Sequence, residues 1–285
     1  IYTTSLTMNR KEFVKTAGFA AASFALFPQN VLQAKEKRYA VDKVKIGLIG
    51  VGLRGQNHLG ELLRRKDVEV SAICDIDSRM IESAKALFSK SGSKMPEIFT
   101  GDKYAWKKLI ALKGLHAVLI ATPWEWHKEM IIGSAEAGIK YIASEVIIGI
   151  TLQDHWEVVK AAERHNAQVM MLENACYRRD VMAVLNMTRQ GLFGELIHLQ
   201  GGYQHDLREV KFNDGAHPYG HGVEFGEKAF SEARWRTEHS VLRNGDLYPT
   251  HGIGPLAHYV NINRGNCFRS LCSFSSKARG LHDYI

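Results

Sequence analysis

The sequence predicts an α/β fold in which a doubly wound parallel sheet carries helices on both of its faces. Two observations support this prediction. The run 44–49 is apolar and alternates too little for a half-exposed strand, so it is typical of a buried parallel strand, and it leads directly into closely spaced glycines. Apolar runs of strand length then alternate with runs of helix length as far as Leu172, which is the order that produces parallel strands joined by helices.

Each strand is expected where a short apolar run is bounded by turn residues or charges. The expected strands of the sheet are 44–49, 68–74, 98–100, 115–122, 141–145 and 169–172. The helices between them are expected from Gly55 through Leu63 and at 79–90, 104–112, 128–138 and 152–165, where apolar residues recur at helical spacing. These elements form the predicted nucleotide-binding domain, residues 40–173.

The second domain is predicted at 174–285, where the pattern is less regular. Its expected elements are a helix at 181–189, a strand at 196–203, a glycine-rich loop at 213–226, a helix at 252–261 and a strand at 268–276. These strands are few for a closed sheet, so we expect an incomplete domain with an exposed sheet edge in a truncated chain.

The glycines after the first strand predict a dinucleotide site. Gly50, Gly52 and Gly55 form the pattern G-x-G-x-x-G between a strand and a helix. A side chain in this turn would hold a pyrophosphate away from the N–H groups at the start of the helix. Three glycines in a turn also occur in ordinary tight loops, so the pattern needs support from its surroundings.

The acid that ends the second strand supplies that support. Asp75 lies 20 residues beyond Gly55, where a carboxylate accepts hydrogen bonds from the adenosine ribose and repels a 2′-phosphate. The sequence therefore favours NAD over NADP, although Arg54 and Arg79 lie close enough to soften the exclusion of NADP. Asp77 is an alternative ribose ligand and also a candidate cap of the next helix.

Composition excludes several other classes of site. The net charge of +7 is spread over single residues and short pairs, which is typical of a solvated surface rather than of a nucleic-acid groove. The four cysteines show no C-x-x-C spacing, so we expect free thiols and no metal site.

The N-terminal residues 1–39 are predicted to be a signal peptide and linker. A basic start at Arg10, Lys11 and Lys15 precedes the apolar run 17–27, which is too short to span a bilayer stably. The start resembles a twin-arginine signal with lysine in place of the second arginine, so we expect a periplasmic or otherwise exported protein. A periplasmic NAD enzyme has no pool of free cofactor, so its NAD would have to stay bound and be regenerated in each turnover.

The segment after the fourth strand is expected to overhang the cofactor crevice. Trp124, Glu125, Trp126 and His127 follow the carboxyl end of a parallel strand, where ligands bind in open α/β sheets. The tryptophans and the histidine would then wall the nicotinamide ribose. The alternative is that they only pack against the following helix.

The order of these elements resembles the glucose-fructose oxidoreductase and inositol dehydrogenase superfamily, which joins a Rossmann domain to an α+β domain with an open, mainly antiparallel sheet. Two superfamily motifs are altered here. The Glu-Lys-Pro motif, whose lysine helps to shift a substrate proton, is matched by Glu145-Val146-Ile147, and Asp-x-Gly-x-His is matched by Tyr248-Pro-Thr-His251. The loss of both acid–base groups weakens the prediction of a simple dehydrogenase.

Longer strings resemble one branch, the NAD-dependent α-N-acetylgalactosaminidases of glycoside hydrolase family 109. They include Glu173-Asn-Ala-Cys-Tyr-Arg-Arg-Asp180, Gly201-Gly-Tyr-Gln-His-Asp206, Trp235-Arg-Thr237 and Tyr248-Pro-Thr-His251. The resemblance implies NAD contacts, together with the glycines, from Leu53, Arg54, Asp75, Trp124, Glu125, Trp126, His127, Glu145, Val146, Asn174, Tyr248 and His251. It implies sugar contacts from Tyr203, Arg236 and Tyr248.

The chemistry implied by the resemblance is oxidation of the sugar at C3, elimination at C1, addition of water and reduction. We therefore expect Tyr203, Tyr248 and His251 to be catalytic as acid–base groups, and Arg236 to anchor or polarise the sugar. The substrate would be a glycan with terminal N-acetylgalactosamine, and a homodimer is an open expectation.

Less specific interpretations remain for these residues and for the protein. Tyr203 is predicted in a strand and would then more often belong to a core, Arg236 could stack on Trp235, and His251 could pair with His258. The alternative functions are an NAD(P)-dependent sugar or polyol dehydrogenase and a non-catalytic NAD-binding protein.

Overall fold

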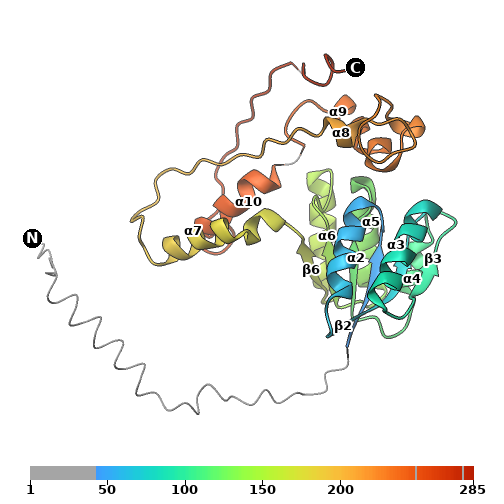
Figure 1. Cartoon of the computed structure of the whole chain (residues 1–285). Coiled ribbons are helices and arrows are strands. Elements are labelled where there is room, and N and C mark those ends of the chain that lie inside the picture. Colours follow the sequence, from blue (N-terminus) through green and yellow to red (C-terminus); the bar gives the residue numbers. More distant parts are fainter. Residues whose placement is uncertain (1–42, 248, 278) are drawn as a thin grey trace, which may run out of the picture. The chain divides into compact units, whose positions relative to one another are not determined.

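Parallel strands in the described part of the chain form one six-stranded sheet in the order β3-β2-β1-β4-β5-β6 (Figure 1). The computed structural model describes residues 43–285 apart from 248 and 278, so the predicted signal peptide and Tyr248 lie outside the described residues. The strands are β1 Val44–Ile49, β2 Val68–Cys74, β3 Glu97–Phe99, β4 Ala117–Ile120, β5 Tyr141–Ser144 and β6 Gln168–Met171. All five pairings are parallel, which confirms the predicted α/β fold.

The order of the strands creates a crevice at their carboxyl ends. β1 pairs with β2 on one side and with β4 on the other, with Ile49 opposite Cys74 and Ile120. From β1 the chain adds β2 and β3 on one side, and it then crosses over to add β4, β5 and β6 on the other side. Ligands bind at such a switch point in open α/β sheets. The site described below lies there.

Helices cover both faces of this sheet. They are α2 Leu53–Leu63, α3 Ser78–Ser91, α4 Trp106–Ile110, α5 Trp124–Glu136 and α6 Leu152–Arg164. Neighbouring residues of β1 point to opposite faces, so Leu48 packs in the buried cluster with α2 and α3, and Ile49 packs in the cluster with α4 and α5. Two cores on one sheet are the structural basis of the doubly wound arrangement.

The second half of the chain is helical and irregular where the structure describes it. Its elements are the 3₁₀ helices η2 Asn174–Tyr177, η3 Gly226–Lys228 and η4 Ser231–Arg234, and the α-helices α7 Arg179–Arg189, α8 Arg208–Lys211, α9 Arg236–Leu242 and α10 Thr250–Tyr259. The Tyr259 hydroxyl donates to the Val181 carbonyl at 3.2 Å, which joins α10 to α7.

The predicted strands at 196–203 and 268–276 are wrong. Neither stretch forms a strand in its described residues, and the only pairings seen after β6 in the described chain are isolated bridges such as that of Asn213 with Glu224. The physical reason is that a strand requires a partner, and a pair of short strands far apart in sequence is marginal without a larger sheet. The expected antiparallel sheet and its exposed edge are therefore absent from the residues that the structure describes.

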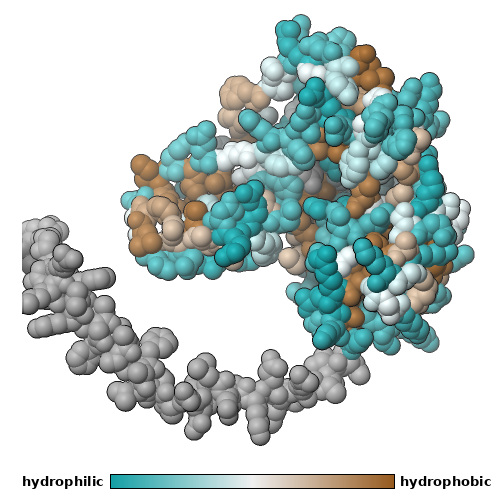
Figure 2. Space-filling view, in the orientation of Figure 1, coloured by the Kyte–Doolittle hydropathy of each residue, from teal (hydrophilic) through white to brown (hydrophobic). Residues whose placement is uncertain are grey.

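Apolar side chains are exposed around α7 (Figure 2). The exposed large apolar residues of this region are Met182, Val184, Met187, Leu192 and Phe193. None of the helices in the described residues is long and apolar enough to cross a membrane.

Candidate functional site

The three glycines after β1 have three different environments that together form a cradle. A Cβ on Gly55 would lie 2.0 Å from the Gly50 carbonyl oxygen, so only glycine lets α2 approach the strand this closely. Gly50 has a φ of +87°, and a Cβ there would lie 2.6 Å from the Ala121 oxygen. Around Gly52 nothing lies within 4 Å of such an atom, so this glycine faces open space at the mouth of the crevice.

This cradle fits a pyrophosphate. Gly52 is the N-cap of α2, and in the described structure no side-chain hydrogen bond caps the start of this helix. Those N–H groups and the positive end of the helix attract an anion. A Cβ at position 52 would occupy the space that a phosphate needs.

Asp75 is held in place by the backbone around the glycine turn. Its Oδ2 accepts from the Val51 N–H at 2.8 Å, and its Oδ1 accepts from the Asp77 N–H at 2.9 Å. Burial raises the pKa of Asp75. The carboxylate thus lies at the carboxyl end of β2 and lines the crevice, where a ribose would meet it.

The neighbouring charged residues are engaged by other groups. Asp77 accepts from the Arg79 N–H at 2.9 Å and caps α3, which is the second of its two expected roles. Arg79 forms an ion pair with Asp77 at 2.8 Å, and Arg54 forms one with Glu145 at 3.0 Å. Both guanidinium groups that could soften the exclusion of NADP therefore already have carboxylate partners.

One cavity of about 600 Å³ contains most of the predicted site residues. It is lined by Gly50, Gly52, Leu53, Arg54, Asp75, Trp124, Glu125, Trp126, Glu145, Val146, Tyr203, Arg236 and His251. Gly55, His127 and Asn174 do not line it. Residues from both halves of the chain thus share one cavity.

The tryptophan segment begins a helix instead of forming a loop. Trp124 is the first residue of α5, with Pro123 as its N-cap, and its Nε1 donates to the Val146 carbonyl at 3.1 Å. His127 is fully buried, and its ring nitrogens lie 2.5 and 2.8 Å from the carbonyl oxygens of Ile147 and Thr122. The ring of His127 therefore joins two backbone segments and does not line the cavity, and its expected contact with the nicotinamide ribose stays a prediction.

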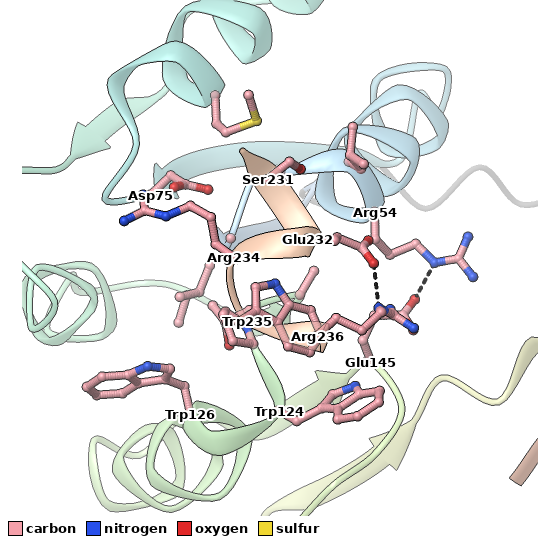
Figure 3. A pocket seen from close by; sticks show the side chains of 18 of the residues that line it. Arg54, Asp75, Trp124, Trp126, Glu145, Ser231, Glu232, Arg234, Trp235 and Arg236 are labelled. Atoms are coloured by element: carbon pink, nitrogen blue, oxygen red, sulfur yellow. Dashed lines mark ion pairs between the residues drawn. The ribbon is translucent and has the colours of Figure 1, made fainter. Parts of the chain in front are cut away.

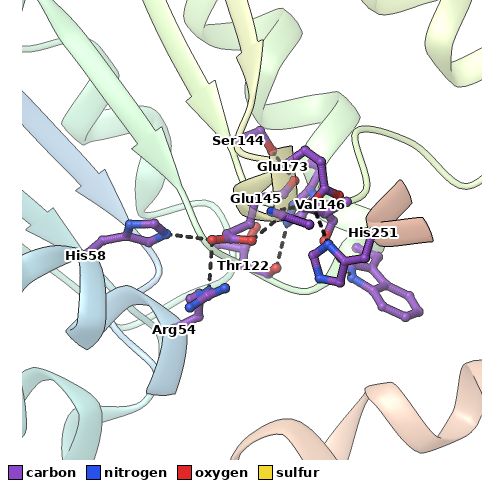
Figure 4. A network of polar contacts seen from close by, with 11 residues as sticks. Arg54, His58, Thr122, Ser144, Glu145, Val146, Glu173 and His251 are labelled. Carbon is purple, nitrogen blue, oxygen red and sulfur yellow. Dashed lines mark hydrogen bonds and ion pairs between the residues drawn. The ribbon is translucent and has the colours of Figure 1, made fainter. Parts of the chain in front are cut away.

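Glu145 is the buried centre of a polar network at the end of β5 (Figure 4). Its Oε1 lies 2.6 Å from His58 Nε2 and 3.0 Å from Arg54 Nε. Burial acts to raise the pKa of Glu145, and the hydrogen bond with His58 and the charge of Arg54 outweigh it, so that the pKa is lowered. His58 was not among the predicted site residues, although its position four residues after Arg54 places both side chains on one face of α2.

His251 is paired with a buried carboxylate. Its Nδ1 lies 2.5 Å from Glu173 Oε1, which also accepts from the Ala175 N–H at 2.9 Å (Figure 4). A carboxylate only accepts hydrogen bonds, so Nδ1 carries the proton and Nε2 is the nitrogen that can exchange one. Glu173 lies two residues after the end of β6, and its place at the carboxyl edge of the sheet was a signal that sequence reasoning missed.

Tyr203 lies beside His251. The two rings are 4.6 Å apart in an edge-to-face arrangement, and the Tyr203 hydroxyl is hydrogen-bonded to His205 Nδ1 at 2.6 Å. Burial raises the pKa of Tyr203. This tyrosine is 41% exposed and lines the cavity, so the interpretation of Tyr203 as a core residue of a strand is wrong.

Arg236 lies over two tryptophans at the cavity wall. Its guanidinium is 5.2 Å from the rings of both Trp124 and Trp235, and its Nε is 2.7 Å from a Glu232 oxygen (Figure 3). Arg236 thus stacks on Trp235, as one interpretation of the sequence expected, and its positive charge also lies at the cavity wall.

Comparison with known proteins finds a different family match for each half of the chain. Residues 44–173 match an oxidoreductase family with an NAD-binding Rossmann fold, and residues 177–285 match the C-terminal domain of glycosyl hydrolase 109. The crevice at the switch point is therefore an NAD site, and its cradle and Asp75 fit that cofactor.

Curated relatives extend beyond this chain. It is 53% identical to a glycosyl hydrolase family 109 protein of Stenotrophomonas maltophilia (strain K279a), over 97% of this chain and 60% of that protein. It is 42% identical to an alpha-N-acetylgalactosaminidase of Tannerella forsythia, over 97% of this chain and 63% of that protein. A solved myo-inositol 2-dehydrogenase from Lactobacillus plantarum aligns at 24% identity and a TM-score of 0.48, over 56% of this chain and 44% of that one.

Proposed function

We propose that the chain belongs to glycosyl hydrolase family 109 and takes part in the release of terminal α-linked N-acetylgalactosamine with NAD as a cofactor. The name of the Tannerella forsythia relative supports the choice of sugar. The observation that carries the proposal is the placement of His251, Tyr203 and Arg236 in the same cavity as the NAD cradle.

The carboxylates of the cavity favour a route other than direct hydrolysis. A hydrolase of the ordinary kind uses two carboxyl groups that flank the glycosidic bond. Here Asp75 is held by two backbone N–H groups, Glu145 by His58 and Arg54, and Glu232 by Arg236. Three further carboxylates line the cavity, and they too have partners: Asp77 pairs with Arg79, Asp102 accepts from the Tyr104 N–H at 2.6 Å, and Glu125 lies 3.5 Å from His239 Nε2. Because all six carboxylates are engaged by the protein's own donors, the histidine and the tyrosine are the better candidates for acid–base work.

When bound, NAD supplies a reversible hydride acceptor, so that C3 of the sugar is transiently a ketone and the cofactor ends as it began. His251 exchanges the proton of the C3 hydroxyl through Nε2, because Glu173 holds Nδ1. Tyr203, hydrogen-bonded to His205, exchanges the proton at C2, which the neighbouring ketone acidifies. Loss of that proton expels the C1 leaving group, and water then adds at C1 while the proton returns to C2. Arg236 anchors the sugar oxygens with its fixed charge.

The test follows an aryl α-N-acetylgalactosaminide in heavy water. Release of aryl alcohol with deuterium at C2 of the free sugar, and no net NADH, is the expected result. Release without deuterium would exclude elimination at C2, and NADH that accumulates with free sugars would indicate a dehydrogenase. The Tannerella forsythia relative, assayed in parallel, shows whether the substrate and the label report as intended.

We also propose that the protein is exported. The support is the basic start and short apolar run of residues 8–27. Expression with this segment and fractionation of the cells would place the protein in the periplasm, and deletion of 8–27 would leave it in the cytoplasm. Retention of the intact form in the cytoplasm would contradict export.

A further inference from the structure

One segment of the second half of the chain lies across the NAD crevice. Residues 230–236, which we call the latch, run from Phe230 through η4 to the first residue of α9. Figure 3 shows the latch passing between Asp75 on one side and Arg54 with Glu145 on the other. Ser231, Glu232 and Arg234 line the same cavity as Gly52 and Asp75.

The latch is anchored in the nucleotide domain at its first residue. Phe230 is 6% exposed and belongs to the buried cluster that contains Leu48, Val51 and Met80. The guanidinium of Arg79 lies 3.8 Å above its ring. This anchor lies at the start of α3, just after Asp75 in the chain, the residue expected to meet the adenosine ribose.

The same residue is fixed to its own half of the chain. The fully buried Asn213 donates through Nδ2 to the Phe230 carbonyl at 2.8 Å, and its Oδ1 accepts from the Phe230 N–H at 3.0 Å. Phe230 therefore joins two parts of the chain that are far apart in sequence.

The other end of the latch rests on the start of α5. The Trp235 ring packs edge-on against Trp124 at 5.2 Å, and Arg236 lies over the same ring. With contacts at the starts of both α3 and α5, the latch spans the crevice from the adenosine side to the nicotinamide side.

Arg234 is the latch residue that faces the adenosine side. It is exposed, it lines the cavity, and its side chain points toward Asp75 (Figure 3). The pKa of Asp77 is lowered chiefly by its hydrogen bond with Arg79, and the charge of Arg234 adds to this effect. A cation at this position attracts the pyrophosphate and the ribose hydroxyls of a dinucleotide.

We propose that the latch retains NAD in its crevice, with Phe230 as the anchor and Arg234 as a residue that contacts the adenosine half of the cofactor. Release of NAD then requires the Phe230 anchor to open, because the latch lies across the crevice. This inference concerns cofactor binding and does not depend on the glycosidase reaction, so it can fail or hold independently of the proposed function.

The experiment measures release of NADH from the protein as it exists, without sugar. The protein is loaded with NADH, chased with excess NAD in a stopped-flow fluorimeter, and the loss of energy transfer from tryptophan to NADH gives the dissociation rate. Arg234→Ala should raise that rate about tenfold and raise the dissociation constant by a similar factor, because a charged contact to the cofactor is lost. Arg234→Lys should show a smaller change.

Arg79→Ala tests the anchor. The substitution removes the stacking on Phe230, while the backbone N–H of residue 79 can still be capped by Asp77. We expect association and dissociation both to accelerate roughly fivefold, since a cation–aromatic contact of this kind has a modest free energy and the latch opens for both steps. Arg208→Ala, an exposed arginine paired with Asp206 outside the latch, is the control and should leave both rates unchanged.

The outcome that would overturn the proposal is a dissociation rate within twofold of the parent protein for both Arg234→Ala and Arg79→Ala. Thermal unfolding of the NAD-free variants is measured alongside. If the two arginines had only a structural role, their substitution would lower the unfolding temperature. It would then not give the expected difference, in which Arg234→Ala changes the affinity for NADH and Arg79→Ala changes both rates.

Discussion

At the scale of single residues, the glycine turn separates two requirements that the motif combines. Gly55 is required by the fold, because a Cβ there would lie 2.0 Å from a backbone oxygen. Gly52 is required by the ligand, because a Cβ there would meet nothing of the protein within 4 Å. The two positions therefore predict opposite patterns of stability and affinity.

Gly52→Ala should leave the thermal unfolding temperature of the NAD-free protein almost unchanged and weaken NAD binding at least tenfold, since the methyl group occupies the space of the pyrophosphate. Gly55→Ala should cost about 3 kcal/mol of stability through overpacking against the strand. Calorimetry of the NAD-free proteins and titration with NAD measure both. Equal loss of stability in the two variants would contradict the assignment of Gly52 to the ligand.

The pairing of His251 with Glu173 gives a second prediction at this scale. Glu173→Gln removes the negative charge that holds Nδ1, so kcat should fall at least tenfold, as expected when the carboxylate that orients a catalytic histidine is replaced by an amide. Glu173→Asp should keep more activity, because the charge stays. NAD affinity is the control and should be similar in all three proteins, since Glu173 does not line the cavity. Normal kcat in Glu173→Gln would show that the pair has no part in the reaction.

At the scale of elements, the first half of the fold could be predicted because its signals are local. The residues of β1 and of the glycine turn that follows it are consecutive in the sequence. The residues that begin α6, from its N-cap Thr151 onward, are consecutive as well. The strand at 196–203 could not be predicted correctly, because pairing depends on a partner elsewhere in the chain. The latch was missed for the same reason, since only the fold brings Phe230 to the cluster of Leu48.

The start of α6 gives a prediction that depends on pH. Thr151 and Asp154 form a capping box, and Lys128 pairs with Asp154 at 3.0 Å. Burial acts to raise the pKa of Asp154, but hydrogen bonds from the Thr151 and Ile150 N–H groups and from Lys128 outweigh it and lower the pKa from 3.8 to about 2. Because the folded pKa is lowered, this contribution to stability is complete above pH 4 and is lost as the pH falls toward 2.

Asp154→Ala should therefore cost about 1 kcal/mol at pH 7, which is the usual cost of losing a helix cap. The difference in the free energy of unfolding between this variant and the parent protein should become smaller as the pH falls below about 4. Urea unfolding at several pH values measures it, and Glu163→Ala, an exposed residue near the other end of α6, is the control. A difference that stays constant down to pH 3 would mean that the carboxylate charge is not the source.

At the scale of the whole chain, the two halves differ in how much apolar surface they bury. The sheet buries apolar residues on both faces, whereas Ile197, Leu271 and Phe274 in the second half are 91, 87 and 95% exposed. These residues lie in the two stretches that were expected to be strands, and the chain spans about three fifths of the length of its curated relatives. Large apolar side chains that are almost fully exposed favour association between molecules.

The double variant Leu271→Ser/Phe274→Ser should therefore reduce self-association of this chain at least threefold, measured by light scattering against protein concentration. NAD affinity should stay the same, because neither residue lines the cavity. Arg269→Gln, an exposed polar neighbour in the same stretch, is the matched control and should scatter as the parent protein does. If the double variant also associates as the parent protein does, the surface responsible lies elsewhere, and the exposed residues around α7 become the next to be substituted.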